Sequence, residues 1–362
     1  MLNFDKTYIL PFKFDIPNYT QEFLAQTPIF KRWIKFIKRY LYIASKGQKN
    51  LEIFKILPEH KNMLWINISA PSLGDSLMDL SSRVLLKGRN IDLFTDKKNV
   101  HIYGDDHIFN NIYSRIEDVK NSEYDLVIID SYSSRSINIK SKIAPSTPFA
   151  GMFGYYNGPE VNRVLFSFHQ MNHLLGYIES EDKINASAKA SMFISKADQE
   201  IINQINLPDR YIAIVLGGEW DYRTYNAWDK VITKILDNDQ KINIVFIGSG
   251  NATSIAKELL DQFSESNIID CVGKYSFNQT AQIIKQSQIL LCCDGGLMHA
   301  SNAVNTPIVP LFARLTPQMQ LTNAIVAFPL FDESDVNNIS VELVLEKHNE
   351  AFNFVDSHPQ GE

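Results

Sequence analysis

The chain has 362 residues, of which 45% are hydrophobic, and this is enough to form the cores of two domains of ordinary size. Its net charge of −6 excludes a globally basic nucleic-acid binder, and no apolar run approaches the roughly 18–20 residues of a membrane span. Cys271, Cys292 and Cys293 have neither metal-ligand spacing nor a disulfide framework, and the N-terminus lacks a signal region. We therefore expect a cytoplasmic protein that does not bind nucleic acid.

The first predicted element is a basic, aromatic helix at residues 30–46. Apolar residues at helical spacing are expected to share one of its faces: Phe30, Trp33, Ile34, Ile37, Leu41 and Ala44. Basic residues lie largely off that face: Lys31, Lys35, Lys38, Arg39 and Lys46. Residues 31–61 carry nine Lys or Arg and two Glu, a local charge of +7. Such a helix can bind an anionic membrane surface, or it can pack by its apolar face on the following domain.

Apolar runs of strand length follow and alternate with helical stretches. They occupy residues 63–68, 91–95, 124–130, 149–156, 211–216, 242–247, 267–272, 289–293 and 308–312. Residues 157–207 contain no clear strand and have a mostly helical pattern. The alternation predicts an α/β fold of two Rossmann-like, doubly wound domains, with a ligand at the carboxyl ends of the strands in a shared cleft.

The expected divisions of the chain follow from these runs. Residues 1–62 are a leader that carries the basic helix and forms part of the first domain. The N-terminal domain is expected at residues 63–180 and the C-terminal domain at 181–330. Residues 331–362 are expected to form an acidic tail or helix, which could also neutralise the basic leader.

The first candidate motif, residues 69–79, directly follows the strand at 63–68. Gly74 allows the backbone to approach a ligand closely, and Asp75 stands where a helix begins. In one interpretation, Asp75 only caps the helix, as carboxylates in strand–helix turns commonly do. In the other, Asp75 is a general base that takes the proton of a substrate hydroxyl.

A second motif, residues 216–228, follows the strand at 211–216. Gly217 and Gly218 form a backbone loop that could approach phosphate oxygens, and Arg223 could neutralise one of them. The alternative is a surface loop with a solvated arginine.

Two further features have structural interpretations. The turn at residues 248–251 lacks the third glycine of a dinucleotide fingerprint, because Thr253 stands there, and it is interpreted as a tight turn on the nucleotide side of the cleft. His169 and His173 lie four residues apart on one helix face without further ligands nearby. We therefore interpret them as structural or as lining the cleft, and we expect no metal.

The most informative motif spans residues 290–312 and runs strand, glycine turn, helix, strand. The turn is Asp294-Gly295-Gly296, and His299 follows on the helix. Backbone without side chains can approach a ligand, and the free N–H groups of a helix start favour an anion such as a diphosphate. Asp294 could instead cap the helix, and His299 could be a buried structural histidine. Their combination on one glycine turn favours contact with a phosphate and a sugar.

Residues 273–312 resemble the signature region of the family 9 glycosyltransferases, the bacterial heptosyltransferases. The family pattern Asp-x-Gly-x-x-His is met by Asp294, the Gly295-Gly296 pair and His299, and Thr306-Pro307 precedes the next strand. The turn at residues 73–75 looks like the N-terminal Gly-Asp motif of the family, and Trp228 looks like the tryptophan of its central loop. The resemblance covers residues 63–330.

This resemblance implies a GT-B fold and an inverting, metal-independent glycosyltransferase with no cofactor. The donor would be a nucleotide-activated heptose, ADP-heptose, and the acceptor a cell-surface glycan or lipopolysaccharide at the cytoplasmic face of the inner membrane. Asp75 would be the catalytic base, and Asp294 would contact the donor sugar. The remaining donor-binding residues would be Gly295, Gly296, His299, Gly217, Gly218 and Arg223. Ser72, Gly74 and Asn226 would be acceptor or cleft contacts.

The central loop departs from the family pattern. Family members commonly carry a lysine two positions before the tryptophan, and here Asn226 stands there. This leaves two alternatives open beside the heptosyltransferase interpretation: another nucleotide sugar as donor, or a catalytically inactive subunit that binds a glycan or a partner. An NAD-dependent oxidoreductase is disfavoured because the fingerprint glycines are incomplete.

Overall fold

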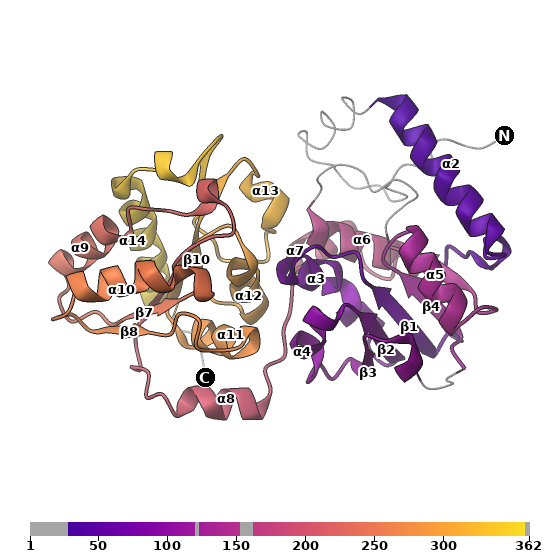
Figure 1. Ribbon diagram of the computed structural model, residues 1–362, viewed down its shortest axis with the longest axis horizontal. Coiled ribbons are helices and arrows are strands. Elements are labelled where there is room, and N and C mark those ends of the chain that lie inside the picture. Colours follow the sequence, from indigo (N-terminus) through magenta and orange to yellow (C-terminus); the bar gives the residue numbers. More distant parts are fainter. Residues whose placement is uncertain (1–27, 120–122, 153–161, 359–362) are drawn as a thin grey trace. The chain divides into compact units, whose positions relative to one another are not determined.

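The computed structural model describes residues 28–119, 123–152 and 162–358, which divide into two compact units between Ala188 and Lys189 (Figure 1). Each unit contains one parallel β-sheet with helices packed against it. The division falls at residue 188, eight residues after the expected boundary at 180.

The N-terminal unit is built on a five-stranded parallel sheet of order β3-β2-β1-β4-β5. Its strands are β1 (Asn62–Asn67), β2 (Asn90–Thr95), β3 (Phe109–Tyr113), β4 (Leu126–Ile129) and β5 (Phe149–Gly151). Its helices are α2 (Ile29–Ser45), α3 (Leu73–Asp79), α4 (Val100–Tyr103), α5 (Ser134–Ile143), α6 (Arg163–Leu174) and α7 (Glu181–Ser187). The predicted strands at 63–68, 91–95 and 124–130 are confirmed as β1, β2 and β4. The strand predicted at 149–156 begins as β5, and its last four residues lie outside the described residues.

The C-terminal unit has a six-stranded parallel sheet of order β11-β10-β9-β6-β7-β8. Its strands are β6 (Ile212–Val215), β7 (Ile244–Ile247), β8 (Ile268–Asp270), β9 (Ile289–Cys293), β10 (Ile308–Ala313) and β11 (Leu330–Asp332). Its helices are α8 (Lys196–Asn203), α9 (Trp228–Asn238), α10 (Thr253–Gln262), α11 (Phe277–Gln286), α12 (Gly296–Val304), α13 (Pro317–Gln320) and α14 (Val341–Ser357). All five strands predicted in this half are confirmed.

Both sheets reverse their strand order at one place. In the N-terminal unit β1 lies between β2 and β4, and in the C-terminal unit β6 lies between β7 and β9. Parallel sheets of this kind bind ligands outside the carboxyl ends of the two strands that flank the reversal. We therefore expect ligand sites in the loops that follow β1 and β4 in the first sheet, and β6 and β9 in the second.

Burial on both faces of the second sheet explains why its strands read as continuous apolar runs. Ile212 and Ile214 of β6 pack into one core cluster with α9, α10 and α14, whereas Ala213 packs into another with α8, α11 and α12. Alternate side chains of a strand point to opposite faces, so each strand needs apolar residues at every position. The segment expected as a tail contributes α14 to the first of these clusters.

Helix α2 packs against α5 (Figure 1). Its packed face is not the apolar face that the spacing of the sequence defines. The buried residues are Phe36 and Ile43, with Trp33 and Tyr40 partly buried beside them. Four of the six residues that the sequence places on the apolar face are exposed large side chains: Phe30, Ile34, Ile37 and Leu41. Of the two interpretations of that face, packing on the following domain is therefore wrong, because a second, aromatic stripe of the helix fits the core. Within the described residues, no helix has both the length and the apolar character needed to cross a bilayer.

Candidate active site

The first candidate site, in the N-terminal unit, lies after β1, where Ser72 and Asp75 start helix α3. Ser72 is the N-cap, and its hydroxyl accepts a hydrogen bond of 3.1 Å from the Asp75 backbone N–H. The Asp75 carboxylate accepts in return from the Ser72 N–H at 3.1 Å and from the Ser72 hydroxyl at 2.6 Å, both through Oδ2. This is a capping box, so the structural role of Asp75 is present. Gly74 is buried within the same helix start.

The other carboxylate oxygen of Asp75 faces an arginine. Arg163, the first residue of α6, places its Nη1 3.6 Å from Asp75 Oδ1. The same guanidinium donates two hydrogen bonds to Asp79, from Nε to Oδ1 at 2.8 Å and from Nη2 to Oδ2 at 2.6 Å. A bidentate pair of this kind fixes the arginine in position. The Asp75 carboxylate thus lies between Ser72, which donates to Oδ2, and a firmly held Arg163, which faces Oδ1.

Asp79 is buried, and this burial raises the pKa of its carboxyl group although Arg163 opposes the shift. Sequence reasoning did not identify Arg163 or Asp79. The spacing of Asp75 and Asp79 is a signal that could have been used, because two carboxylates four residues apart share one helix face and call for a cation. The position of that cation, 84 residues further along the chain, could not be read from a pattern.

Asp130 connects the two strands at the reversal and was also missed. It follows β4, and its Oδ2 accepts hydrogen bonds from the backbone N–H groups of Ile68 and Ser69, which follow β1, at 2.8 and 2.7 Å. Its Oδ1 accepts from the Ser131 N–H and the Ser136 hydroxyl at 2.6 and 2.7 Å. With four donors in place, this buried carboxylate fixes the loop that leads to Ser72 and Asp75.

A second candidate site, in the C-terminal unit, is the turn between β9 and α12. Gly295 is the N-cap of α12, no side chain caps this helix start, and its first turn contains no acidic residue. The backbone of Gly295 is extended, with φ 173°, and a Cβ added there would meet nothing within 4 Å. A Cβ on Gly296 would make only an ordinary contact of 3.7 Å with Phe277. The fold itself therefore does not require either residue to be glycine. Close approach of a ligand to the backbone would explain why both are.

The glycines after β6 have the opposite explanation. Gly217 has φ +77° and a Cβ there would lie 2.9 Å from the Ala252 Cβ, while a Cβ on Gly218 would lie 2.7 Å from the Arg223 carbonyl oxygen. Neighbouring protein atoms require these two residues to be glycine. Their identity consequently carries no information about a phosphate, although their loop borders the reversal between β6 and β9.

Arg223 and Asp294 come together at this reversal. Arg223 Nη1 lies 3.3 Å from Asp294 Oδ2, and their side chains are 20% and 3% exposed. Arg223 Nε and Asp294 Oδ2 are buried and have no hydrogen-bond partner among the described residues. Buried polar atoms nearly always have hydrogen-bond partners, so Arg223 Nε and Asp294 Oδ2 retain a hydrogen-bonding capacity that the described residues leave unused, although Oδ2 also faces Arg223 Nη1.

A second arginine lies beside this pair. Arg314 directly follows β10, has a left-handed φ of +67°, and is exposed. Its guanidinium lies 3.8 Å from the ring centre of Tyr222, and the guanidinium of Arg223 lies 5.4 Å from the same ring. Two cations from different loops therefore share one aromatic ring at the carboxyl ends of β6 and β10. Sequence reasoning considered Arg223 alone, because Arg314 lies outside the motifs.

The other predicted site residues have these positions. His299 is buried on α12, and Trp228 is buried at the start of α9 with its ring 5.1 Å from that of Tyr225. Asn226 is exposed, and its backbone N–H donates to Asn337 Oδ1 at 2.8 Å.

The two histidines of α6 have structural surroundings. His169 Nε2 is 2.8 Å from Asn185 Oδ1, and the ring of His173 contacts that of Tyr177 with centres 5.5 Å apart. Burial lowers the pKa of both imidazoles. Across the described ranges, no group of three His, Cys, Asp or Glu residues is arranged to hold a metal ion.

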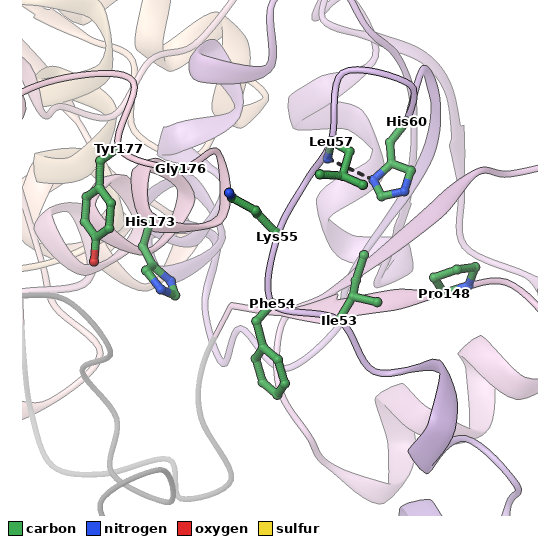
Figure 2. A pocket seen from close by; sticks show the side chains of 9 residues that line it. All are labelled: Ile53, Phe54, Lys55, Leu57, His60, Pro148, His173, Gly176 and Tyr177. Atoms are coloured by element: carbon green, nitrogen blue, oxygen red, sulfur yellow. Dashed lines mark hydrogen bonds between the residues drawn. The ribbon is translucent and has the colours of Figure 1, made fainter.

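A separate pocket of about 610 Å³ lies in the N-terminal unit (Figure 2). Its lining residues are Ile53, Phe54, Lys55, Leu57, His60, Pro148, His173, Gly176 and Tyr177. His60 precedes β1 and Pro148 precedes β5, so this pocket lies at the amino ends of the strands. Asp75 follows the carboxyl end of β1, and the pocket is therefore distinct from the candidate site.

Comparison with protein families agrees with the motifs. A family model described as glycosyltransferase family 9 (heptosyltransferase) matches residues 156–327, an interval that contains β6, β9 and α12. The resemblance to this family is thereby confirmed. No curated protein matches the chain by sequence.

Solved structures share the fold. A glycosyl transferase family 9 protein from Veillonella parvula superimposes with a TM-score of 0.69 at 14% identity and covers 83% of this chain and 99% of its own. The ADP-heptose lps heptosyltransferase II of E. coli gives 0.64 at 18% identity, covering 82% and 99%. The E. coli heptosyltransferase WaaC with ADP gives 0.62 at 16% identity, covering 80% and 99%. The predicted GT-B class, with two Rossmann-like α/β domains, is confirmed.

Proposed function

We propose that this protein, which has the fold and a signature match of the family 9 glycosyltransferases, transfers a sugar from a nucleotide-diphosphate donor to a glycan hydroxyl. The observation that carries the proposal is the β9–α12 turn, where Gly295 and Gly296 are not required by the fold and the helix start is uncapped. A free helix start beside a cation suits a diphosphate. The donor that we propose is ADP-heptose, since the E. coli enzyme with the same fold is described with ADP.

The donor contacts follow from the residues around that turn. The α12 N–H groups and Arg223 would hold the diphosphate, with His299 on the same helix and the Gly217-Gly218 loop at its side. Asp294, which is 3.3 Å from Arg223, would accept hydrogen bonds from hydroxyls of the donor sugar. Because helix N–H groups and arginine can stabilise the leaving diphosphate, the proposed reaction needs no metal and no cofactor.

The acceptor contacts would come from the start of α3. The acceptor hydroxyl attacks the anomeric carbon, its proton passes to Asp75 Oδ1, and the bond from that carbon to the diphosphate oxygen breaks. A single displacement of this kind inverts the anomeric configuration. Ser72 would hold Asp75 in place through Oδ2, where it already donates at 2.6 Å. Gly74 and Asn226 are proposed as acceptor or cleft contacts.

The acceptor that we propose is a cell-surface glycan or lipopolysaccharide precursor. Such an acceptor is carried by lipid, which would place the reaction in the cytoplasm at the inner face of the membrane.

Two observations favour a second candidate function. Asp75 is engaged by Ser72 in a capping box, and Asn226 stands where family members commonly have lysine. A subunit that binds a nucleotide sugar or glycan without transferring it would keep the capping box for stability alone. A third candidate is a glycosyltransferase with the same catalytic chemistry that uses another donor sugar or another nucleotide base.

Binding and turnover distinguish these candidates. Isothermal titration with ADP, UDP and GDP on the purified chain should give binding for one diphosphate, ADP, in buffer that contains EDTA. Transfer is then followed with ADP-heptose and a truncated lipopolysaccharide acceptor by mass spectrometry, which also detects donor hydrolysis. Binding without transfer or hydrolysis favours the inactive subunit, and binding of another nucleotide favours a different donor. Absence of binding to all three nucleotides contradicts the proposal.

A further inference from the structure

Helix α2 presents an apolar stripe to solvent. The stripe consists of Phe30, Ile34, Ile37 and Leu41, whose spacing of four, three and four residues places them on one face over three turns. Their exposed fractions are 73%, 36%, 43% and 59%. Other exposed large apolar residues occur in the described part of the chain, but none of its other helices carries more than one, so the α2 stripe is a continuous surface rather than scattered exposure.

The α2 stripe is distinct from the face by which the helix is attached. Phe36 and Ile43 are 6% and 0% exposed and belong to a core cluster with Ile137 of α5 and Phe149 of β5. The stripe points away from these residues around the helix axis, given the 100° between successive residues. The helix is therefore held firmly on one side while its second apolar side remains in solvent.

The charges beside the stripe are all basic. Lys31 and Lys38 are exposed next to it, Lys46 follows the helix, and α2 contains no acidic residue. Anionic lipid attracts such residues, and an apolar stripe with a basic border is the pattern of helices that lie in the plane of a membrane surface. The acidic remainder of the chain would be repelled by the same surface, which orients α2 toward it.

We propose that α2 is a membrane-docking helix, which inserts Phe30, Ile34, Ile37 and Leu41 into the headgroup region of an anionic bilayer. A second copy of the chain fits this surface less well, because stripe-to-stripe packing would bring Lys31 and Lys38 against like charges of the partner. The inference extends the proposed function by naming the surface that brings the enzyme to a lipid-linked acceptor. Its test measures lipid binding and does not depend on transfer.

The experiment uses the full chain and vesicles of phosphatidylcholine with or without phosphatidylglycerol. The chain should sediment with the anionic vesicles and less with pure phosphatidylcholine, and added salt should weaken the binding. The triple variant Ile34→Ser, Ile37→Ser, Leu41→Ser should lose about tenfold or more in partitioning. The variant Lys31→Gln, Lys38→Gln should lose most of its preference for anionic vesicles.

A matched control removes exposed apolar residues elsewhere. Ile201→Ser with Leu343→Ser changes side chains that are 42% and 45% exposed on α8 and α14, and it should leave vesicle binding unchanged. Thermal unfolding verifies that each variant is folded. Absence of binding by the wild-type chain, equal loss in the control, or a wild-type dimer that the triple variant converts to a monomer without changing lipid binding would each overturn the inference. ADP titration of the same samples tests the proposed function separately, since α2 is not assigned to the donor site.

Discussion

Arg163 and Asp75 face each other at 3.6 Å across helices α3 and α6, while the same guanidinium holds Asp79 through two hydrogen bonds. One cation thus serves two carboxylates with different tasks. Asp79 is buried and fixes the arginine, whereas Asp75 is partly exposed and its Oδ1 faces Arg163 at a distance longer than that of a hydrogen bond. Under the proposed function, Arg163 and Asp79 support the fold and Asp75 takes the proton, and the first two predictions test this division.

Replacement of Asp75 by asparagine should abolish transfer and leave nucleotide binding intact. The amide oxygen can still accept from Ser72, so the helix start is preserved, but the amide cannot take a proton. We expect kcat to fall by about 10²–10⁴-fold with an unchanged Kd for ADP, measured by titration calorimetry. Ser72→Ala is the control, because it removes the cap and should lower stability by about 1 kcal/mol. Parallel loss of turnover and ADP binding in Asp75→Asn would show that Asp75 is structural.

Replacement of Arg163 by methionine should destabilise the N-terminal unit. Asp79 would remain buried without its cation, and losing one partner of a buried pair costs about 3 kcal/mol. Because burial already raises the pKa of the Asp79 carboxyl group, acid should protonate it and reduce the penalty, so the loss in urea midpoint should be smaller at pH 5 than at pH 8. The double variant Arg163→Met, Asp79→Asn should recover much of the stability. A penalty independent of pH and of Asp79 would contradict this pairing.

Replacement of Gly295 by alanine should affect ligand binding and leave the fold intact. The backbone there is extended and the added Cβ meets no protein atom within 4 Å, so the free energy of unfolding should change by less than about 1 kcal/mol. A diphosphate held against this turn would meet the new methyl group, and we expect the Kd for ADP to rise about tenfold or more. The control is Gly104→Ala in the N-terminal unit, where an added Cβ would lie 3.8 Å from the nearest protein atom. Equal ADP affinity in both variants would remove the turn from the donor site.

Replacement of Arg223 should test whether this arginine takes the role of the family lysine that Asn226 replaces. Arg223→Met removes the cation that lies 3.3 Å from Asp294. ADP binding should become weaker, and its affinity should vary less with salt concentration. Arg223→Lys keeps the charge without the planar fork and should have an intermediate effect. Arg314→Met serves as a comparison, because Arg314 shares the Tyr222 ring but makes no ion pair with Asp294 among the described contacts. If Arg314→Met weakens binding more than Arg223→Met, the main phosphate cation has been misassigned.

The sequence predicted the central strands well because burial on both faces leaves an unbroken apolar run. The strands that it missed are edge strands: β3 carries exposed Asn110 and Asn111, and β11 is three residues long with Phe331 exposed. An edge strand packs on fewer neighbours, so its composition resembles that of a loop. The interpretation that α2 packs by its predicted apolar face was wrong, because periodicity alone does not rank two apolar stripes of one helix.

The candidate site shows the same limit. Sequence motifs identified residues whose neighbours in the structure are also close in the sequence, such as Asp75 and the Asp294–Gly296 turn. They did not identify Arg163, Asp130 or Arg314, because each meets its partners only after the chain has folded. Conversely, the motif suggested a ligand-binding role for Gly217 and Gly218, and the structure supplies a sufficient steric reason for both glycines.

Alkaline pH should destabilise the protein through its cysteines. Burial raises the pKa of the Cys271 and Cys293 thiols to about 11 and about 12, and that of Cys292 also lies well above its usual value. The folded thiols therefore keep protons that unfolded thiols lose above a pH of about 8.5, so the free energy of unfolding should fall as pH rises through this window. Between pH 7.5 and 9.5 each thiol should contribute a loss of about 1.4 kcal/mol, measurable by urea titration. Iodoacetamide at pH 8 should modify these cysteines only after unfolding, and Cys293→Ala should reduce the pH dependence by about one third. Rapid alkylation of the native chain, or stability that is unchanged up to pH 9.5, would contradict their burial.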